Sequence, residues 1–199
     1  MELAILARHG EADHNPVRRV NGDPRQPIHL TERGRQEAGR LGAELADRVI
    51  DLCVVTEFPR TRETADVALA GRDVPRLQVP ELNDPTFGDL EGHPIEEVRA
   101  FVDQHGALAE FPGGGESRVA VIRRYYAGFS EVVHRQERVV LVVAHGLPVT
   151  AVQLAASGKP VPLSLHGIAE AHAEPRSMTR DELLAGIEGM RRWAAEQAG

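Results

Sequence analysis

Short apolar runs alternate along the chain with longer stretches in which apolar residues recur at helical spacing. The runs at 3–7, 52–56 and 139–145 are continuous rather than alternating with polar residues, which is typical of strands covered on both faces. Helices are predicted elsewhere, at about 32–49, 60–70, 94–105, 116–135, 148–156 and 179–198. Alternating strands and helices predict an α/β fold, a three-layer sandwich in which helices flank a mostly parallel sheet.

Polar residues follow each of the three predicted strands. Arg8 and His9 follow the first strand, Thr56 follows the second and His145 follows the third. Parallel sheets bind ligands beyond the carboxyl ends of their strands, so we expect these side chains to gather at one edge. An arginine beside a histidine is costly to bury unless an anion compensates both. The pair therefore either lies in solvent at a strand end or forms part of an anion site.

Size and composition are those of one globular domain spanning 1–199, with a cap-like excursion over the sheet edge around 83–118. The net charge of −7 disfavours a nucleic-acid partner, because nucleic-acid-binding proteins usually carry a basic excess. No apolar stretch approaches the ~20 residues that a transmembrane helix needs, so no membrane partner is expected. The single cysteine, Cys53, excludes an intrachain disulfide. A cytoplasmic enzyme or binding protein is the class that remains.

Six sequence elements occur in an order that resembles a known family. They are ARHGEADHN, NGDPRQPIHLTERGRQEAGRLG, VVTEFPRTRETA, LNDPTFGDLEG, PGGGES and VVAHG. Their order is similar to that of the histidine phosphatase superfamily, also called the phosphoglycerate-mutase-like family. The tripeptide RHG alone is a weak signal, whereas six elements in the same order are highly specific. The resemblance implies a phosphoglycerate-mutase-like fold.

The resemblance also implies a phosphomonoester hydrolase that acts on a small phosphorylated metabolite without a cofactor or a metal. His9 would be the nucleophile that attacks phosphorus and forms a phosphohistidine. Arg8 and Arg60 would bind the phosphoryl oxygens, because guanidinium groups match that geometry and stay charged. His145 would donate a hydrogen bond to the same oxygens as charge builds in the transition state. Asn15 is a further candidate for phosphate binding.

The remaining role is that of an acid that donates a proton to the leaving oxygen. The same group later acts as a base and activates water. The family usually has a glutamate at this position, and this chain has Asp84. Aspartate is one methylene shorter than glutamate and has an ordinary pKa of about 3.9. The alternative is that Asp84 only starts a turn before Pro85. Glu57 stands near the expected phosphate site, where it either pairs with Arg60 or Arg62 or turns to solvent.

Two other functions compete with hydrolysis. A phosphoglycerate-type mutase returns the phosphoryl group to a second substrate oxygen, and cofactor-dependent mutases carry a long basic insertion after the acid-bearing segment. Here the stretch between Gly92 and Gly113 is short and mostly acidic and apolar, which favours hydrolysis. The second competitor is a non-catalytic phosphate-binding or interaction protein on the same fold, which the aspartate at position 84 leaves open.

A metal site is the main alternative chemistry at the first strand end. His9, Glu11, Asp13 and His14 are all residue types that ligate cations. Their spacing matches no common ligand motif, and Arg8 would repel a cation. No metal is therefore expected.

Several other residues are assigned no role in the chemistry. Arg123 and Arg124 are expected on a solvated helix face. Trp193 is expected to pack on the core or on a partner subunit, which leaves a homodimer open. The remaining histidines are expected singly on surfaces or in loops. They are His29, His93, His105, His134, His166 and His172.

Overall fold

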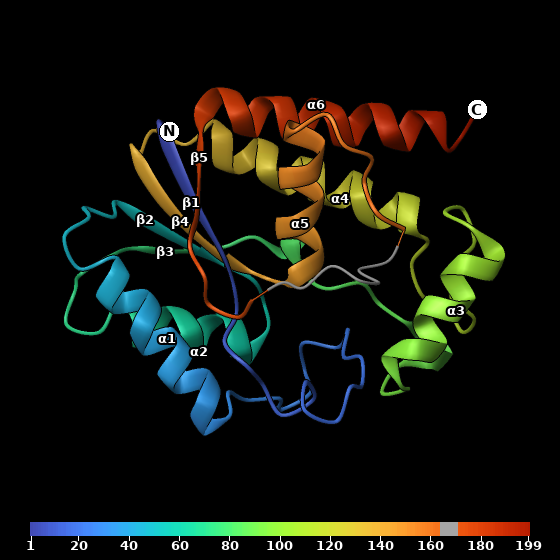
Figure 1. The fold of residues 1–199 in the computed structure, drawn as a ribbon, viewed down its shortest axis with the longest axis horizontal. Coiled ribbons are helices and arrows are strands. Elements are labelled where there is room, and N and C mark those ends of the chain that lie inside the picture. The colour runs from blue at the N-terminus through green and yellow to red at the C-terminus, as the bar shows by residue number, and fades with distance from the viewer. Residues whose placement is uncertain (164–170) are drawn as a thin grey trace.

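The computed structural model describes residues 1–163 and 171–199 (Figure 1), so His166 lies outside the described residues. The strands are β1 (Leu3–Arg8), β2 (Leu52–Val55), β3 (Arg76–Gln78), β4 (Val139–Ala144) and β5 (Arg176–Thr179). The α-helices are α1 (Glu32–Glu44), α2 (Pro59–Ala68), α3 (Ile95–His105), α4 (Arg118–Val133), α5 (Gly146–Ala156) and α6 (Arg180–Glu196). Two short 3-10 helices, η1 (Pro80–Leu82) and η2 (Gly88–Leu90), follow β3. None of the described helices is long and apolar enough to cross a membrane.

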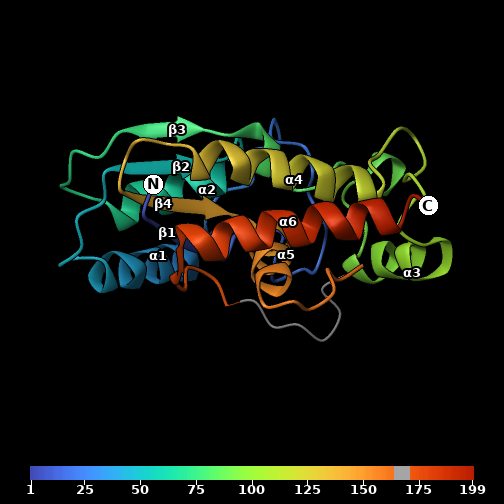
Figure 2. The same ribbon diagram turned by 90° about the horizontal axis from the view of Figure 1, so that it is seen from above.

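The five strands form one sheet in the order β3-β2-β4-β1-β5. Strands β1 to β4 pair in parallel, and β5, at the edge, runs antiparallel to β1. Figures 1 and 2 show α1 and α2 on one face of this sheet and α4, α5 and α6 on the other. The predicted α/β sandwich with a mostly parallel sheet is therefore confirmed.

Two apolar clusters, one on each face of the sheet, hold these layers together. Successive strand residues point to opposite faces, so Leu6 packs in the cluster under α4, α5 and α6, whereas Ile5 packs in the cluster under α1 and α2. Val142 and Leu141 of β4 divide between the two faces in the same way, and all four side chains are fully buried. Trp193 of α6 belongs to the first cluster, so it packs on the core.

Some elements differ in extent from the prediction. Strands β3 and β5 were not predicted, because both are short and mostly exposed and neither forms an apolar run. Helix α1 begins after Thr31, whose Oγ1 accepts from the amide of Gly34 at 3.0 Å, but it ends at Glu44 instead of continuing to 49. Helix α4 begins at Arg118, because the preceding Ser117 caps it through the amide of Ala120.

Helix α3 lies apart from the helices that cover the sheet (Figures 1 and 2). It packs instead on a small apolar cluster within the segment 83–118 and the loop after β1. The buried members of this cluster are Val20, Phe87, Val98, Val102 and Phe111. Several of these side chains form an apolar wall of the cavity described next.

Candidate active site

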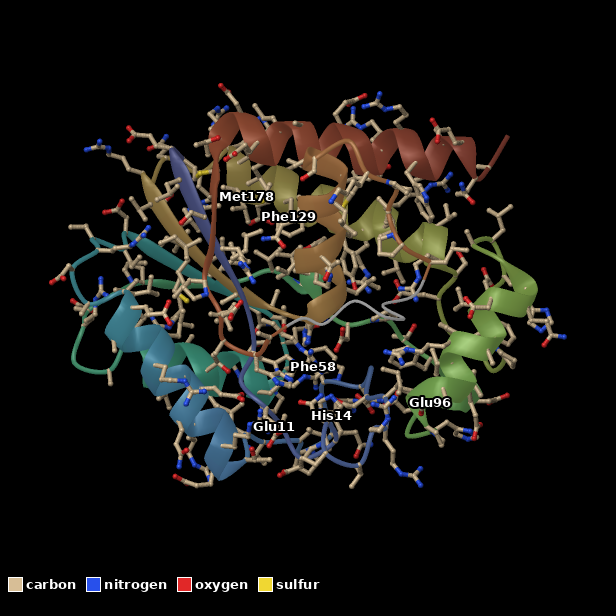
Figure 3. All side chains as sticks on the ribbon, viewed as in Figure 1. Glu11, His14, Phe58, Glu96, Phe129 and Met178 are labelled. Atoms are coloured by element: carbon tan, nitrogen blue, oxygen red, sulfur yellow. The ribbon has the colours of Figure 1, made fainter. Side chains whose placement is uncertain are left out.

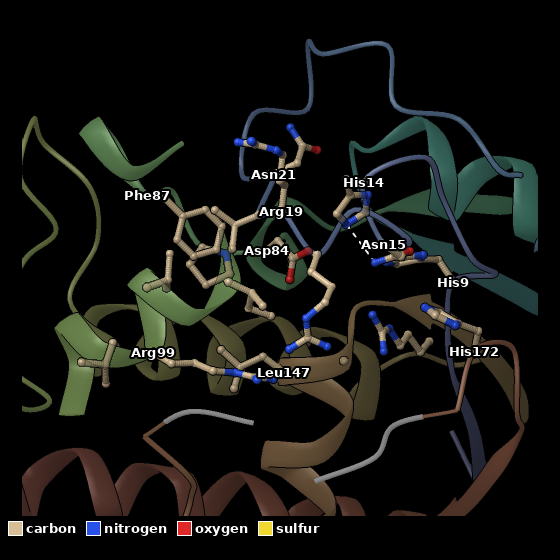
Figure 4. Close-up of a pocket in the computed structure, with 18 of the residues that line it drawn as sticks. His9, His14, Asn15, Arg19, Asn21, Asp84, Phe87, Arg99, Leu147 and His172 are labelled. Atoms are coloured by element: carbon tan, nitrogen blue, oxygen red, sulfur yellow. Dashed lines mark hydrogen bonds between the residues drawn. The ribbon is translucent and has the colours of Figure 1, made fainter. Parts of the chain in front are cut away.

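Residues from the ends of β1 and β4 meet at a cavity of about 340 Å³ (Figure 4). Arg8, His9 and Asn15 come from the end of β1 and the loop that follows it, and Asp84 comes from the loop after η1. His145 lies beside His9, because β1 and β4 pair in register as far as the residues that precede the two histidines. The side chains that follow these strands therefore gather at one edge of the sheet, as their positions in the sequence predict.

Figure 3 places this edge relative to the core of the molecule. Glu11, His14 and Phe58 lie together at the end of the sheet that carries the cavity. Phe129 and Met178 lie at the opposite end, among the helices that cover the sheet.

His9 is buried, and both of its ring nitrogens have partners. Nδ1 lies 2.7 Å from the carbonyl oxygen of Gly10, and Nε2 lies 3.2 Å from Nε of Arg60. A carbonyl only accepts and a guanidinium only donates, so the proton is assigned to Nδ1 and the lone pair to Nε2. Burial, followed by the charges of Arg60 and Arg8, holds the pKa of His9 well below its usual range. The imidazole is therefore neutral at pH 7.

The loop that carries His9 depends on a close approach between two glycines. A Cβ at Gly10 would lie 2.4 Å from the carbonyl oxygen of Gly34, and a Cβ at Gly34 would lie 1.9 Å from the carbonyl oxygen of Glu11. Neither gap can hold a methyl group, so the first turn of α1 packs directly on the backbone after β1. The amide of Gly10 also donates to Oγ1 of Thr64 in α2 at 3.0 Å. Contacts from α1 and α2 thus fix the position of Gly10, whose carbonyl oxygen sets the tautomer of His9.

Arg60, near the start of α2, is completely buried and links several site residues. Nη1 donates to Oδ1 of Asn21 at 2.6 Å, and Nη2 donates to Oδ2 of Asp84 at 2.7 Å. The guanidinium also lies over the ring of Phe58, 4.1 Å from its centre. Arg60 therefore sits between the candidate nucleophile and a carboxylate. The sequence reasoning missed Asn21, because it lies in a long loop rather than at a strand end.

His145 is fully buried next to His9, with ring centres 5.4 Å apart and ring planes at 70°. Its Nδ1 lies 3.0 Å from Oδ2 of Asp84, and its Nε2 lies 3.0 Å from Oγ1 of Thr56. Nη2 of Arg60 also lies 3.3 Å from Nδ1, but the carboxylate of Asp84 is closer and only accepts. The proton is therefore assigned to Nδ1, and the hydroxyl of Thr56 donates to Nε2. Burial lowers the pKa of His145 to about 4, although the carboxylate of Asp84 opposes this shift. The ring is therefore a neutral donor at pH 7.

Asp84 lines the cavity (Figure 4), and Oδ2 of its carboxylate contacts Arg60 at 2.7 Å and His145 at 3.0 Å. Burial raises the pKa of this carboxyl, but His145 and Arg60 together outweigh burial and hold the pKa well below its usual value. Asp84 is therefore ionised in the free protein. A residue that only started a turn before Pro85 would not account for these two contacts.

Two side chains hold the backbone that carries Asp84. Glu57 accepts from Nδ2 of Asn83 at 2.7 Å, and the amide of Glu57 donates to Oδ1 of the same residue at 3.1 Å. Nη1 of Arg124 donates to the carbonyl oxygens of Glu81 and Asn83 at 2.8 and 2.9 Å. Glu57 therefore pairs with an asparagine beside the catalytic candidate, rather than with an arginine of α2.

The expectation that Arg124 lies on a solvated helix face is wrong. Its guanidinium is only 22% exposed and forms an ion pair with Glu116 at 2.9 Å. Its neighbour Arg123 is exposed, as expected. The loop on which Asp84 lies passes alongside α4, and the long side chain of Arg124 covers it. Helical spacing alone did not predict this contact, because it says nothing about which loop lies over a helix.

Asn15 and His14 line the cavity close to His9. Oδ1 of Asn15 accepts from the amide of Ala12 at 2.8 Å, and its Nδ2 lies 3.1 Å from Nε2 of His14, the contact dashed in Figure 4. Burial lowers the pKa of His14 to about 3. Asn15 is thus placed beside the proposed phosphate site, and His14 joins it as a neutral imidazole.

His172 lies in a loop, as expected, but it does not stand singly, because it joins the site. Its ring centre lies 5.8 Å from that of His9. It is held there because the amide of Ala173 donates to the carbonyl oxygen of Arg8 at 2.9 Å. Burial lowers the pKa of His172 to about 3. No local pattern predicted this placement, which follows from the antiparallel return of β5 along β1.

The geometry at the centre of the site suits an anion better than a metal ion. Ligand atoms of His9, Asp84 and His145 lie within 4.8 Å of one another, which is close enough to surround a cation. Arg60, however, already donates to two of these three groups, and a cation would have to displace it. The charge of Arg8 lowers the pKa of both histidines and would likewise oppose a cation.

The metal set considered at the first strand end does not assemble. Oε1 of Glu11 accepts from the hydroxyl of Thr31 at 2.9 Å, and Asp13 is exposed. These two carboxylates are therefore not directed toward His9 together.

Comparison with known proteins finds one family. Residues 4–179 match the histidine phosphatase superfamily (branch 1). The adenosylcobalamin/alpha-ribazole phosphatase of Escherichia coli (strain K12) is 32% identical over 149 residues, which cover 70% of this chain and 71% of that protein. Phosphoserine phosphatase 1 of Hydrogenobacter thermophilus is 31% identical over 170 residues, which cover 79% of this chain and 77% of that protein.

The fold has close counterparts among solved structures. The crystal structure of a putative alpha-ribazole-5'-P phosphatase from Escherichia coli superposes with a TM-score of 0.78. The superposition covers 89% of this chain and 90% of that chain, at 24% identity. This likeness concerns the fold.

Proposed function

Because the chain belongs to the histidine phosphatase superfamily and is a phosphatase, we propose that it hydrolyses phosphate monoesters of a small metabolite through a phosphohistidine at His9. The observation that carries the proposal is the state of His9, a neutral imidazole whose Nε2 lone pair faces a guanidinium. A nucleophile must be unprotonated at the attacking atom, and the phosphoryl group that it attacks needs cations around its oxygens.

The phosphoryl group binds beside His9, between Arg8 and Asn15, which line the cavity, and Arg60 and His145, which lie next to His9. In the free protein Arg60 donates to Nε2 of His9. An arriving phosphoryl oxygen takes this donor, so the lone pair becomes available when the substrate is in place. The guanidinium groups and the Nδ1–H of His145 then stabilise the charge that builds on the oxygens in the transition state.

Asp84 supplies the proton to the leaving oxygen. Its pKa is low while Arg60 and His145 face it. A bound phosphoryl dianion draws Arg60 away and adds negative charge nearby, and both changes raise the pKa of Asp84. Asp84 therefore takes up a proton as the substrate binds. As the bond from Nε2 of His9 to phosphorus forms, the bond to the leaving oxygen breaks, and that oxygen takes the proton from Asp84.

Water completes the reaction. The ionised Asp84 accepts a proton from a water molecule, whose oxygen attacks phosphorus while the bond to Nε2 of His9 breaks. Inorganic phosphate leaves, and His9 returns to its neutral form. These steps use no metal ion and no organic cofactor.

Trapping of the covalent intermediate tests the proposal. Wild-type protein mixed briefly with a radiolabelled ester and quenched in base should retain label on histidine, and acid should release it. His9→Gln should retain no label and show no turnover. Turnover in the wild type without label would overturn the phosphohistidine, and turnover in His9→Gln would overturn the role of His9.

The same protein preparations separate the two competing functions. Interconversion of 2- and 3-phosphoglycerate at a rate above their hydrolysis would make the protein a mutase. Binding of inorganic phosphate, with no turnover of any ester in a panel, would make it a non-catalytic phosphate-binding protein. The names of the relatives identify the first esters for the panel, alpha-ribazole phosphate and phosphoserine.

The proposal also includes a cytoplasmic location and leaves a homodimer open. A cytoplasmic location agrees with a chain whose one cysteine is buried and free. The dimer rests on sequence reasoning, and Trp193 does not contribute to it because this side chain packs on the core. Light scattering of the purified protein measures its mass in solution and tests the dimer directly.

A further inference from the structure

Arg118 is a buried cation that the proposed mechanism does not use. It is the first residue of α4, and it lines the cavity of the active site. Only 8% of the residue is exposed, and neither Nε nor Nη1 has a hydrogen-bond partner among the described residues. Buried charges are almost always paired, because an unpaired one loses its hydration without compensation. Among residues 1–163 and 171–199 this charge thus has no partner, and a bound anion would supply one.

The cavity has two ends, with Asp84 between them (Figure 4). His9 and His172 lie at one end, where the phosphoryl group is proposed to bind. Phe87 and Arg99 lie at the other end. Because Asp84 is the proposed proton donor to the leaving oxygen, the far end is where the rest of the substrate extends.

Arg118 belongs to the far end of this cavity. The charges that act most strongly on His9 are those of Arg60 and Arg8. Burial lowers the pKa of Arg118, and Asp84 is among the groups that oppose this shift. The backbone on either side of Arg118 lies against that end, since the amide of Glu116 donates to the carbonyl oxygen of Thr86 and the amide of Val119 donates to the carbonyl oxygen of Ala107, both at 3.0 Å.

A second cation at the far end is likewise without an ion pair or a hydrogen bond among the described residues. Arg99 of α3 lines the cavity and forms no ion pair or hydrogen bond within residues 1–163 and 171–199. The other arginines nearby are engaged, since Arg18 pairs with Glu96 and Arg19 donates to the carbonyl oxygen of Gly92 at 2.5 Å. Two guanidinium groups therefore remain available for a ligand.

We propose that Arg118, assisted by Arg99, binds an anionic group on the leaving-group side of the substrate, so that the enzyme prefers phosphate esters whose alcohol carries a carboxylate. The inference rests on the proposed function, because it assigns the far end of the cavity to the alcohol. Charge-assisted hydrogen bonds to a carboxylate would supply the partner that Arg118 lacks. The apolar wall formed by Phe87 and Val98 would contact the carbon atoms between the two anionic groups. A cavity of about 340 Å³ has room for a small metabolite of this kind.

Two esters that differ in one group test this subsite. 3-Phosphoglycerate carries a carboxylate where glycerol 3-phosphate carries a neutral hydroxymethyl group. Wild-type protein should show a higher kcat/KM for 3-phosphoglycerate. In Arg118→Met the ratio of the two kcat/KM values should fall about 10- to 100-fold, the range expected for a hydrogen bond to a charged group. Arg123→Met, on the exposed face of the same helix, is the matched control and should keep the wild-type ratio.

An equal loss of kcat/KM for both esters would overturn the proposal, because Arg118 would then be a phosphoryl contact or a structural residue. An unchanged ratio would overturn it as well. The inhibition constant of inorganic phosphate in Arg118→Met should stay within about twofold of the wild-type value. If Arg118 contacted the phosphoryl group, phosphate would inhibit the variant more weakly. The variant removes an unpaired buried charge, so its melting temperature should equal or exceed that of the wild type.

A binding measurement separates this inference from the proposed hydrolysis. In His9→Gln, which cannot turn over by the proposed route, 3-phosphoglycerate should raise the melting temperature more than glycerol 3-phosphate does. Adding Arg118→Met to that background should remove the difference between the two esters. If the difference depends on Arg118 while no ester is hydrolysed by the wild type, the subsite stands and the proposed hydrolysis fails. If neither ester binds selectively although hydrolysis occurs, the subsite fails alone.

Discussion

Oδ2 of Asp84 lies 2.7 Å from Nη2 of Arg60, so the proposed proton donor is held as a carboxylate by the residue that is proposed to bind the phosphoryl group. The same oxygen lies 3.0 Å from Nδ1 of His145. In the free protein the pKa of Asp84 is therefore far too low for an acid at neutral pH. Substrate and carboxylate compete for Arg60, and this competition links substrate binding to protonation of Asp84.

Asp84→Asn should slow turnover without weakening phosphate binding. The amide cannot transfer a proton, and general acid–base catalysis contributes about 10²- to 10⁴-fold to a rate, so kcat should fall within that range. Inorganic phosphate should bind at least as tightly, because the substitution removes the anion that competes for Arg60. Steady-state kinetics with phosphate as the inhibitor measures both quantities. Unchanged turnover would remove Asp84 from the mechanism.

Arg124→Gln should reduce activity although this residue lies outside the cavity. Its side chain holds the carbonyl oxygens of Glu81 and Asn83, next to Asp84. Loss of these charge-assisted bonds should lower the free energy of unfolding by about 1–3 kcal/mol and should lower kcat by misplacing the carboxylate. Arg123→Gln on the exposed face is the control. Equal kcat values in the two variants would show that Arg124 does not position Asp84.

The buried histidines predict that the fold weakens in mild acid. Burial lowers the pKa of His172 to about 3, against about 6.5 in the unfolded chain. Below pH 6.5 the unfolded state therefore binds more protons than the folded state. The free energy of unfolding is unaffected by this histidine above pH 6.5 and falls progressively as the pH decreases toward 3. At pH 5 one such histidine lowers the free energy of unfolding by about 2 kcal/mol.

Urea unfolding of His172→Gln at pH 7 and at pH 5 checks this expectation. The difference in unfolding free energy between the two pH values should be smaller in the variant than in the wild type. His134→Gln, at an exposed position outside the cavity, should leave the difference as it is. An acid sensitivity that is the same in all three proteins would contradict the assignment of a neutral, partly buried imidazole at position 172.

Removal of metal ions should leave hydrolysis unaffected. Arg60 donates to His9 and to Asp84, two of the three groups that would have to bind a cation. Activity after extended dialysis against a chelator should therefore equal that of the untreated protein within error. A loss that is restored by one added divalent ion would instead show that these side chains form a metal site.

Much of the fold was predictable because its strands are buried on both faces. The runs that became β1, β2 and β4 are continuous and apolar, and such runs have few alternatives to a covered sheet. Strands β3 and β5 lie at the edges, where exposed residues such as Arg76 and Arg176 leave no such pattern. The division into one domain with an excursion around 83–118 stays a prediction.

Only the site residues that lie at strand ends or in family motifs could be predicted from the sequence. The rule for strand ends placed His9 and His145 together, and the resemblance added Arg60 and Asp84. Asn21, His172 and Arg118 come from loops and a helix start whose positions depend on long-range packing. His172, for example, is placed by a strand that returns antiparallel to β1, and no residue near it in the sequence carries that information.

The contact between Gly10 and Gly34 divides the sequence into positions that can vary and positions that cannot. The nucleophile is held by backbone against backbone, so no compensating side-chain change elsewhere can restore the contact once either glycine is replaced. The far wall of the cavity is built from side chains such as Phe87, Val98 and Arg118, which can be exchanged without moving that backbone. If a library of variants is selected for hydrolysis of a new ester, substitutions should recur in the far wall of the cavity. Gly10 and Gly34 should be unchanged in the selected variants.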